Sequence, residues 1–166
     1  MVSRRGSNTT YAYAGIIFSF FIAFSLVIFP LPASINFLRP DFASLVLIYW
    51  VVNLPNVAGV VLAFMVGIFY DLLAGSSFGV MGFTMSTVAF FAINMRMRLR
   101  ILRFSQHFLL ISLLLATSQF VHLCFQLILK QPPLSPTYWL SCIVSTLCWP
   151  FVSNLLNNYQ RIFNIY

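Results

Sequence analysis

Six apolar stretches, separated by short polar or proline-containing segments, make up most of this sequence. Only 7% of its 166 residues are charged, whereas 61% are hydrophobic. Such a chain has too few polar side chains to cover a folded core with a water-soluble surface. Because one membrane crossing needs about 20 apolar residues, the length allows about six crossings and no separate soluble domain. We therefore predict an all-α membrane protein, in which a six-transmembrane-helix bundle forms one integral membrane domain over residues 1–166.

Proline, glycine, asparagine and arginine residues bound the apolar stretches and set the limits of the predicted segments. The second segment, with about 13 residues or roughly 20 Å of helix, is short against a hydrocarbon core of about 30 Å. Either Pro40 and Asp41 enter the interface, or the bilayer thins locally, or the segment is re-entrant and covered by neighbouring helices. The six segments span about residues 11–29, 42–54, 57–73, 80–95, 108–129 and 137–156.

Basic residues in the gaps between apolar stretches account for the net charge of +7 and predict the topology. Arg4 and Arg5 precede the first segment, and a basic loop follows the fourth. Short basic loops stay in the cytoplasm, so an even number of crossings separates these two regions and the second segment counts as a crossing. Six crossings then place both termini in the cytoplasm. The arginines of the basic loop are Arg96, Arg98, Arg100 and Arg103.

The alternation of arginine with apolar residues in the basic loop suits a membrane surface. The apolar side chains can enter the interface while the guanidinium groups reach anionic lipid headgroups, or an acidic cytoplasmic partner. Because the basic residues lie between membrane segments, we do not expect nucleic-acid binding.

A ridge of small residues runs along the third segment and the turn that follows it. Its members recur every fourth residue, so on a helix they form one face with little bulk, against which another helix backbone can lie. Asp71, one of only two acidic residues in the chain, should face protein or a wet cavity, since an unpaired carboxylate is costly in lipid. The ridge therefore predicts an interface with a partner helix. Its residues are Gly59, Ala63, Gly67, Asp71, Gly75 and Gly79.

A second interpretation of the same stretch is purely structural. Asp71 ends one helix and caps the next, while Gly75 and Gly79 supply the turn between them. Capping and partner contact can coexist at a helix end. Similarly, Arg39, Pro40 and Asp41 predict the start of the second helix together with an ion pair, because proline suits the first turn and aspartate complements the helix dipole.

A polar stripe interrupts the fifth segment. Ser118, His122 and Gln126 are spaced by four residues, and Gln119 lies beside them. The stripe either forms hydrogen bonds between helices or lines a ligand cavity.

The sequence lacks the residue groupings that catalysis requires. It offers no nucleophile with a base, no metal-ligand spacing and no phosphate-binding glycine loop. Asp41 and Asp71 are expected at the same outer side, where they could approach each other, but Arg39 favours an ion-pair network there. Cys124, Cys142 and Cys148 lie in apolar segments as small core residues. We therefore predict no enzymatic activity, no metal and no cofactor.

Four stretches in order resemble one family over nearly the whole chain. They are FLRPDFASLVLIYW at residues 37–50, NLPN at 53–56, GIFYDLLAGSSFGVMGFTMS at 67–86 and LCWP at 147–150. Together they resemble MreD, the rod shape-determining membrane protein of bacteria. The residues that match its motifs are Arg39, Pro40, Asp41, Gly67, Asp71, Gly75, Gly79, Trp149 and Pro150.

The resemblance implies a multi-pass protein of the bacterial inner membrane, in the cell-elongation machinery. It implies pairing with the single-span protein MreC and action with the MreB filament, RodA and its partner transpeptidase. It also implies a fold similar to the six-helix substrate-binding subunits of ECF transporters. We therefore expect a non-catalytic scaffold that binds an MreC-like helix. The alternative is a small-molecule or lipid-binding subunit of a transporter, and homodimerisation stays open.

Overall fold

A computed structural model describes residues 4–28, 40–54, 57–101, 104–130 and 138–162, and the regular elements in these ranges are all helices. This confirms the all-α prediction. The helices are α1 (Arg4–Ile28), α2 (Phe42–Asn53), α3 (Val60–Ala74), α4 (Val80–Ile101), α5 (Phe104–Ile128) and α6 (Tyr138–Ile162).

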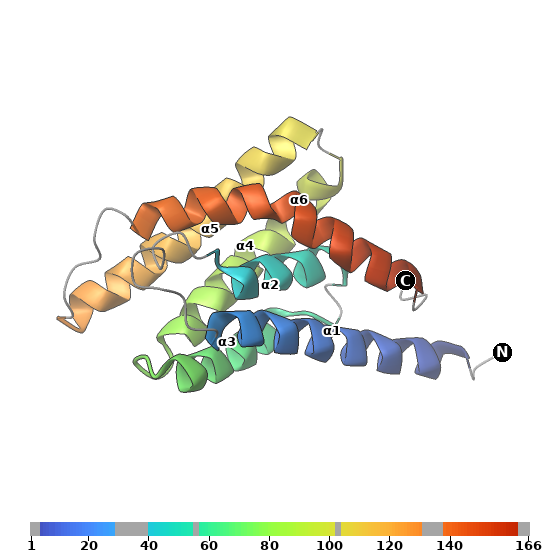
Figure 1. Cartoon of the computed structure of the whole chain (residues 1–166), viewed down its shortest axis with the longest axis horizontal. Coiled ribbons are helices and arrows are strands. Elements are labelled where there is room, and N and C mark those ends of the chain that lie inside the picture. Colours follow the sequence, from blue (N-terminus) through green and yellow to red (C-terminus); the bar gives the residue numbers. More distant parts are fainter. Residues whose placement is uncertain (1–3, 29–39, 55–56, 102–103, 131–137, 163–166) are drawn as a thin grey trace.

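Helix α2 lies at the centre, with longer helices around it (Figure 1). It contacts α1, α4 and α6. The most extensive helix pair is α3 with α4, and α4 and α6 both pack on α5, whereas only a few residues of α1 reach α6. The start of α1 and the end of α6 lie at the same end of the bundle, while the α3–α4 turn and the end of α5 lie at the other (Figure 1). The two ends are called here the terminal end and the turn end.

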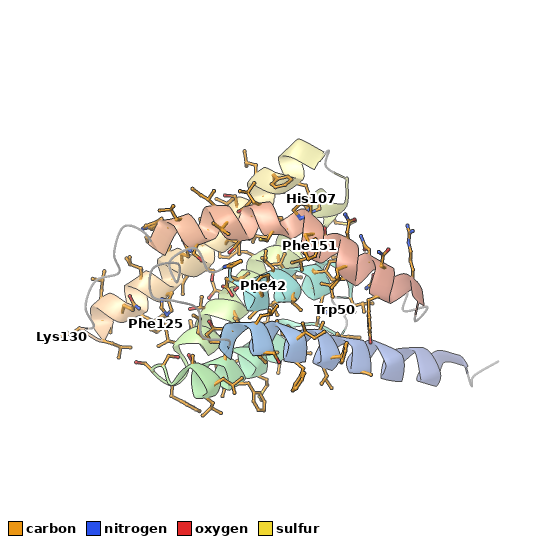
Figure 2. The ribbon with its side chains drawn as sticks, in the orientation of Figure 1. Phe42, Trp50, His107, Phe125, Lys130 and Phe151 are labelled. Carbon is orange, nitrogen blue, oxygen red and sulfur yellow. The ribbon has the colours of Figure 1, made fainter. Side chains whose placement is uncertain are left out.

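The core is built around α2, in which the ten residues from Ala43 to Val52 are all buried. Trp50 is the largest fully buried side chain and points into the bundle (Figure 2). Met85 of α4 and Ile111 of α5 are buried in the same cluster. Many large apolar side chains on the outer helices are instead exposed, such as Val61, Phe78 and Ile128, as expected where lipid replaces water as the solvent.

The burial of α2 explains how a helix this short fits into the bundle. Neighbouring helices cover the second segment, and its crossing of the membrane stays a prediction. A helix of 12 residues surrounded by protein does not have to match the hydrocarbon thickness along its own length, because its ends contact protein rather than acyl chains.

Several helices extend beyond the predicted membrane segments. Helix α1 begins at Arg4, before the segment that starts near Tyr11, while α4 continues to Ile101 and α6 to Ile162, past the segments that end near Met95 and Leu156. Polar or basic residues precede the apolar run in α1 and follow it in α4 and α6, without breaking the helix. In α4 the added residues are mostly arginine, methionine and leucine, which are strong helix formers.

Length and apolar character mark three helices as candidate membrane spans within the described ranges, at Val80–Met97, His107–Ile128 and Trp139–Arg161. The apolar parts of the other three are shorter, at Ala14–Val27, Phe42–Asn53 and Val60–Ala74. The crossing of the bilayer by all six segments stays a prediction.

Candidate functional site

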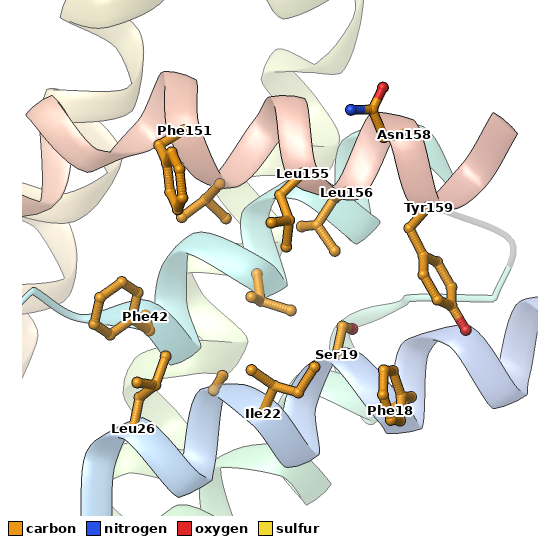
Figure 3. A pocket seen from close by; sticks show the side chains of 13 residues that line it. Phe18, Ser19, Ile22, Leu26, Phe42, Phe151, Leu155, Leu156, Asn158 and Tyr159 are labelled. Carbon is orange, nitrogen blue, oxygen red and sulfur yellow. The ribbon is translucent and has the colours of Figure 1, made fainter. Parts of the chain in front are cut away.

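An apolar groove of about 310 Å³ opens between α1 and α6, with α2 as its floor (Figure 3). We call it the α1–α6 groove. In Figure 3, Ile22 and Leu26 of α1 lie across from Phe151 and Leu155 of α6. Its lining residues are Phe18, Ser19, Ile22, Ala23, Leu26, Phe42, Val46, Phe151, Val152, Leu155, Leu156, Asn158 and Tyr159.

The groove is closed towards the terminal end. The rings of Phe18 and Tyr159 stack there with their centroids 6.2 Å apart. From this contact the walls run along α1 and α6, where the lining residues recur every three or four positions. This spacing places them on one stripe of each helix, so the groove follows the helix axes.

Polar contacts fix the floor to both walls. The indole Nε1–H of Trp50 in α2 donates to Ser19 Oγ of α1 at 2.8 Å. At the other side of α2, the Tyr49 hydroxyl donates to Asn157 Oδ1 of α6 at 2.7 Å. The backbone N–H of Asp41 donates to Ser145 Oγ of α6, also at 2.8 Å. Because these bonds hold α1 and α6 to α2 rather than to each other, the groove between the walls stays open.

The small-residue ridge lies against another helix, and that helix is α4 of the same chain. Ala63, Gly67 and Asp71 are buried on α3. A Cβ atom built on Gly67 would overlap the Cα of Gly82 in α4, so the two backbones are in direct contact. A partner helix therefore cannot occupy the place of α4 in this fold. Ala63, Gly67 and Asp71 thus belong to a helix contact within the chain, and contact of the ridge with a partner helix stays a prediction.

The structural interpretation of Asp71, Gly75 and Gly79 is confirmed. The Asp71 carboxylate is 1% exposed and accepts hydrogen bonds from the backbone N–H groups of Gly79 (2.8 Å) and Met81 (3.1 Å) at the start of α4. Ser76 Oγ donates to its Oδ1 at 2.6 Å. Gly75 and Gly79 have φ values of 63° and 91°, which favour glycine. Gly59, the first ridge residue, is the N-cap of α3.

Asp41 starts α2 as predicted. Its carboxylate accepts a hydrogen bond from the backbone N–H of Ser44 at 3.1 Å, and the carbonyl oxygen of Pro40 accepts one from Phe42 N–H at 3.0 Å. Arg39 lies outside the described residues, so the predicted ion pair stays a prediction.

The predicted basic loop is helical in its first part. Arg96, Arg98 and Arg100 belong to the last turns of α4, while Arg103 lies outside the described residues. The Nε atom of Arg96 is buried and has no hydrogen-bond partner in the part of the chain that the structure describes.

The polar stripe of α5 divides into two parts. Ser118 and Gln119 are buried in the bundle. His122 and Gln126 instead line a second hollow, the α3–α5 cavity, between the α3–α4 turn and the end of α5. The charges of Asp41 and Asp71 both act on the imidazole of His122, while the approach of the two carboxylates to each other stays a prediction. Within the described ranges, no group of three His, Cys, Asp or Glu residues could hold a metal ion.

Sequence reasoning missed the α1–α6 groove. Its walls consist of ordinary apolar residues, such as Ile22 and Leu155, that a membrane helix shows on any face. One available signal was Trp50 with Ser19, since a buried indole N–H needs an acceptor. That pairing would have placed α1 against α2. The apolar residues of α1 beside Ser19 would then have indicated a further contact surface on this helix.

These features define an all-helical membrane protein with an unfilled apolar groove along its side. A family model described as rod shape-determining protein MreD matches residues 7–159. The chain is 31% identical over 146 residues to the rod shape-determining protein MreD of Haemophilus influenzae (strain ATCC 51907 / DSM 11121 / KW20 / Rd), an alignment that covers 87% of this chain and 90% of that relative. The chain therefore belongs to the MreD family. No solved structure matches it significantly, so the fold similarity to ECF transporter subunits stays a prediction.

Proposed function

We propose that this chain is a non-catalytic scaffold of the bacterial cell-elongation complex, which binds the single transmembrane helix of an MreC-like partner in the α1–α6 groove. Membership of the MreD family supports a role in rod-shape determination. The observation that carries the finer proposal is the groove itself, because it is apolar and runs along two helices.

The exposure of the groove walls favours a helix as the occupant. Phe151 and Leu155 on α6 are 72% and 55% exposed, and Phe18 on α1 is 53% exposed. A third helix lying between α1 and α6 would cover these side chains together, and helix association in membranes depends on such van der Waals packing. Large side chains spaced by one helical turn also provide the gaps into which a partner's side chains insert.

The charge distribution supports the proposed orientation. The described arginines Arg4, Arg5, Arg96, Arg98, Arg100 and Arg161 all belong to helix ends at the terminal end of the bundle. Basic residues favour the cytoplasmic side. We therefore place both termini in the cytoplasm of a bacterium, with the chain crossing its inner membrane several times. There the basic end of α4 is available to anionic lipid, or to a cytoplasmic complex that contains the MreB filament, RodA and its transpeptidase.

A matched pair of phenylalanine variants tests the proposal. Phe151→Ala removes a ring of the groove wall that is 72% exposed. Phe120→Ala removes a ring that is 58% exposed from α5, away from the groove. Truncating a large interface residue weakens binding about tenfold or more. In membranes that contain a tagged MreC-like partner, Phe151→Ala should co-purify with about one tenth of the partner, and Phe120→Ala with the wild-type amount.

Equal partner recovery with both variants would contradict the groove as the interface. If tagged and untagged copies of this chain co-purify instead, and Phe151→Ala abolishes that, the groove is a homodimer contact. If the groove retains only lipid in native mass spectrometry and partner recovery is unchanged, its occupant is an acyl chain.

A further inference from the structure

The α3–α5 cavity differs from the groove in its chemistry and has a volume of about 490 Å³. This volume falls within the range of small-molecule sites, which is about 300–1,000 Å³. The cavity lies at the turn end, where the α3–α4 turn meets the last two turns of α5. Its lining consists of Gly75, Ser76, Ser77, Val80, His122, Gln126 and Leu129.

The lining offers hydrogen-bond acceptors. The Oε1 atom of Gln126 is buried and has no hydrogen-bond donor among the residues that the structure describes. The hydroxyl hydrogen of Ser76 is already directed at Asp71 Oδ1, 2.6 Å away, so the Ser76 oxygen presents only lone pairs to other groups. A buried acceptor without a donor, together with the Ser76 lone pairs, favours a ligand that carries hydroxyl or N–H groups.

The charges around the cavity disfavour an anion. The start of α4 would normally attract negative charge, but the Asp71 carboxylate already accepts the N–H groups of Gly79 and Met81 there. The negative charges of Asp41 and Asp71 also act on His122 in the cavity wall. Neither carboxylate lines the cavity, so a cationic ligand would not find the direct ion pair that it needs when desolvated. An uncharged ligand that donates hydrogen bonds avoids both the repulsion of an anion and the missing ion pair of a cation.

The site is also held in place before any ligand binds. Asp71 fixes Ser76 and the first residues of α4 in one network, and Gly75 and Gly79 adopt the turn conformation that the network needs. Gln126 projects from the neighbouring α5, which packs on α4. Groups held by packed helices and a buried carboxylate lose little freedom on binding.

We propose that the α3–α5 cavity is a binding site for a small, uncharged, hydroxyl-rich molecule of the polyol or sugar class. The ligand donates hydroxyl hydrogens to Gln126 Oε1 and Ser76 Oγ at the turn end of the bundle. This site goes beyond the scaffold function and is separate from the α1–α6 groove, because no residue lines both.

Saturation-transfer NMR on the full chain in nanodiscs tests the proposal, with glycerol, glucose and N-acetylglucosamine as the neutral probes. At least one of them should bind saturably. Glucose 6-phosphate and putrescine serve as the anionic and cationic comparisons and should bind more weakly. Gln126→Leu should weaken binding of the neutral probe about tenfold, since it removes one acceptor. The control is Gln119→Leu, the same change two turns earlier on α5 and outside the cavity lining, which should leave binding unchanged.

A second variant separates loss of binding from loss of folding. Leu129→Trp fills the cavity without removing a polar group, and it should also reduce binding while the melting temperature stays at the wild-type value. The proposal is overturned if none of the three neutral probes binds saturably. It is also overturned if Gln126→Leu and Gln119→Leu bind equally well, or if the phosphate or the diamine is preferred.

Discussion

The helix pairs α3–α4 and α1–α6 lie on different sides of the bundle and pack in opposite ways. Gly67 and Gly82 let the backbones of α3 and α4 touch. Large side chains such as Ile22 and Leu155 line a groove between α1 and α6, and both helices are attached to α2. Small residues thus let one pair of helices close on each other, whereas the pair without them leaves a groove. We call α3–α4 the closed pair and α1–α6 the open pair. The closed pair is part of the fold, and the groove of the open pair is the proposed binding surface.

The largest expected effect is on the closed pair, at its buried carboxylate. Asp71→Ala leaves the N–H groups of Gly79 and Met81 and the Ser76 hydroxyl without their acceptor, which should destabilise the fold by about 4 kcal/mol. The comparison is Asp41→Ala, which removes the N-cap of α2 and the acceptor of the buried Ser44 hydroxyl and should cost about 2 kcal/mol. Thermal unfolding in detergent measures both. Equal effects of the two changes would show that Asp71 does not hold the α3–α4 turn.

Backbone contact in the closed pair gives the next effect. Gly67→Ala places a methyl group against the Gly82 backbone, so the helices must separate, at a cost of about 3 kcal/mol. In Gly82→Ala the nearest neighbours of the new methyl group are the side chains of Phe64 and Ile68, at 3.3 Å, and these can move. We expect a clearly lower melting temperature for the first variant and a small change for the second. The reverse order would contradict the α3–α4 packing.

The attachment of the open pair should contribute less. Trp50→Phe removes the hydrogen bond to Ser19 and leaves a small cavity in the core, which together should cost about 2 kcal/mol. Trp139→Phe, at a position 44% exposed, is the control and should have little effect. An unchanged melting temperature of Trp50→Phe would show that the hydrogen bond to Ser19 is not needed to hold α1 against α2.

The closed end of the groove should contribute least to stability. Phe18→Leu removes the stacking contact with Tyr159 but keeps an apolar side chain, so the cost should be about 1 kcal/mol or less. Its effect should appear instead in the accessibility of Tyr159, measured by hydroxyl-radical footprinting. Unchanged footprinting would mean that the two rings do not close the groove.

The closed pair was largely predictable from sequence and the open pair was not. Spacing by four residues identified Ala63, Gly67 and Asp71 as a helix-contact face, because small residues favour close approach. The pattern did not specify which helix fills the face, since any helix backbone satisfies it. The capping by Asp71 and the turn at Gly75 and Gly79 followed from the local turn chemistry of these residue types. These features depend on neighbours in sequence.

The open pair depends on contacts between distant residues. The bond from Tyr49 to Asn157 joins residues 108 positions apart, and no local pattern marks it. His122 and Gln126 were predicted as a stripe on one helix, but the cavity also needs Ser76 and Ser77 from the α3–α4 turn. The hydrophobic pattern likewise located the apolar segments without the helix ends, because α4 and α6 extend past them.

Site-specific photocrosslinking in living cells tests the central claim most directly. A photoreactive amino acid at Ile22 or Leu155 lies in the groove, and one at Phe69 of α3 or Leu113 of α5 lies on other lipid-facing surfaces. The groove positions should crosslink to the transmembrane helix of the MreC-like partner, and the other two should not. Crosslinks to that helix from Phe69 or Leu113 alone would contradict the account and move the interface away from the open pair.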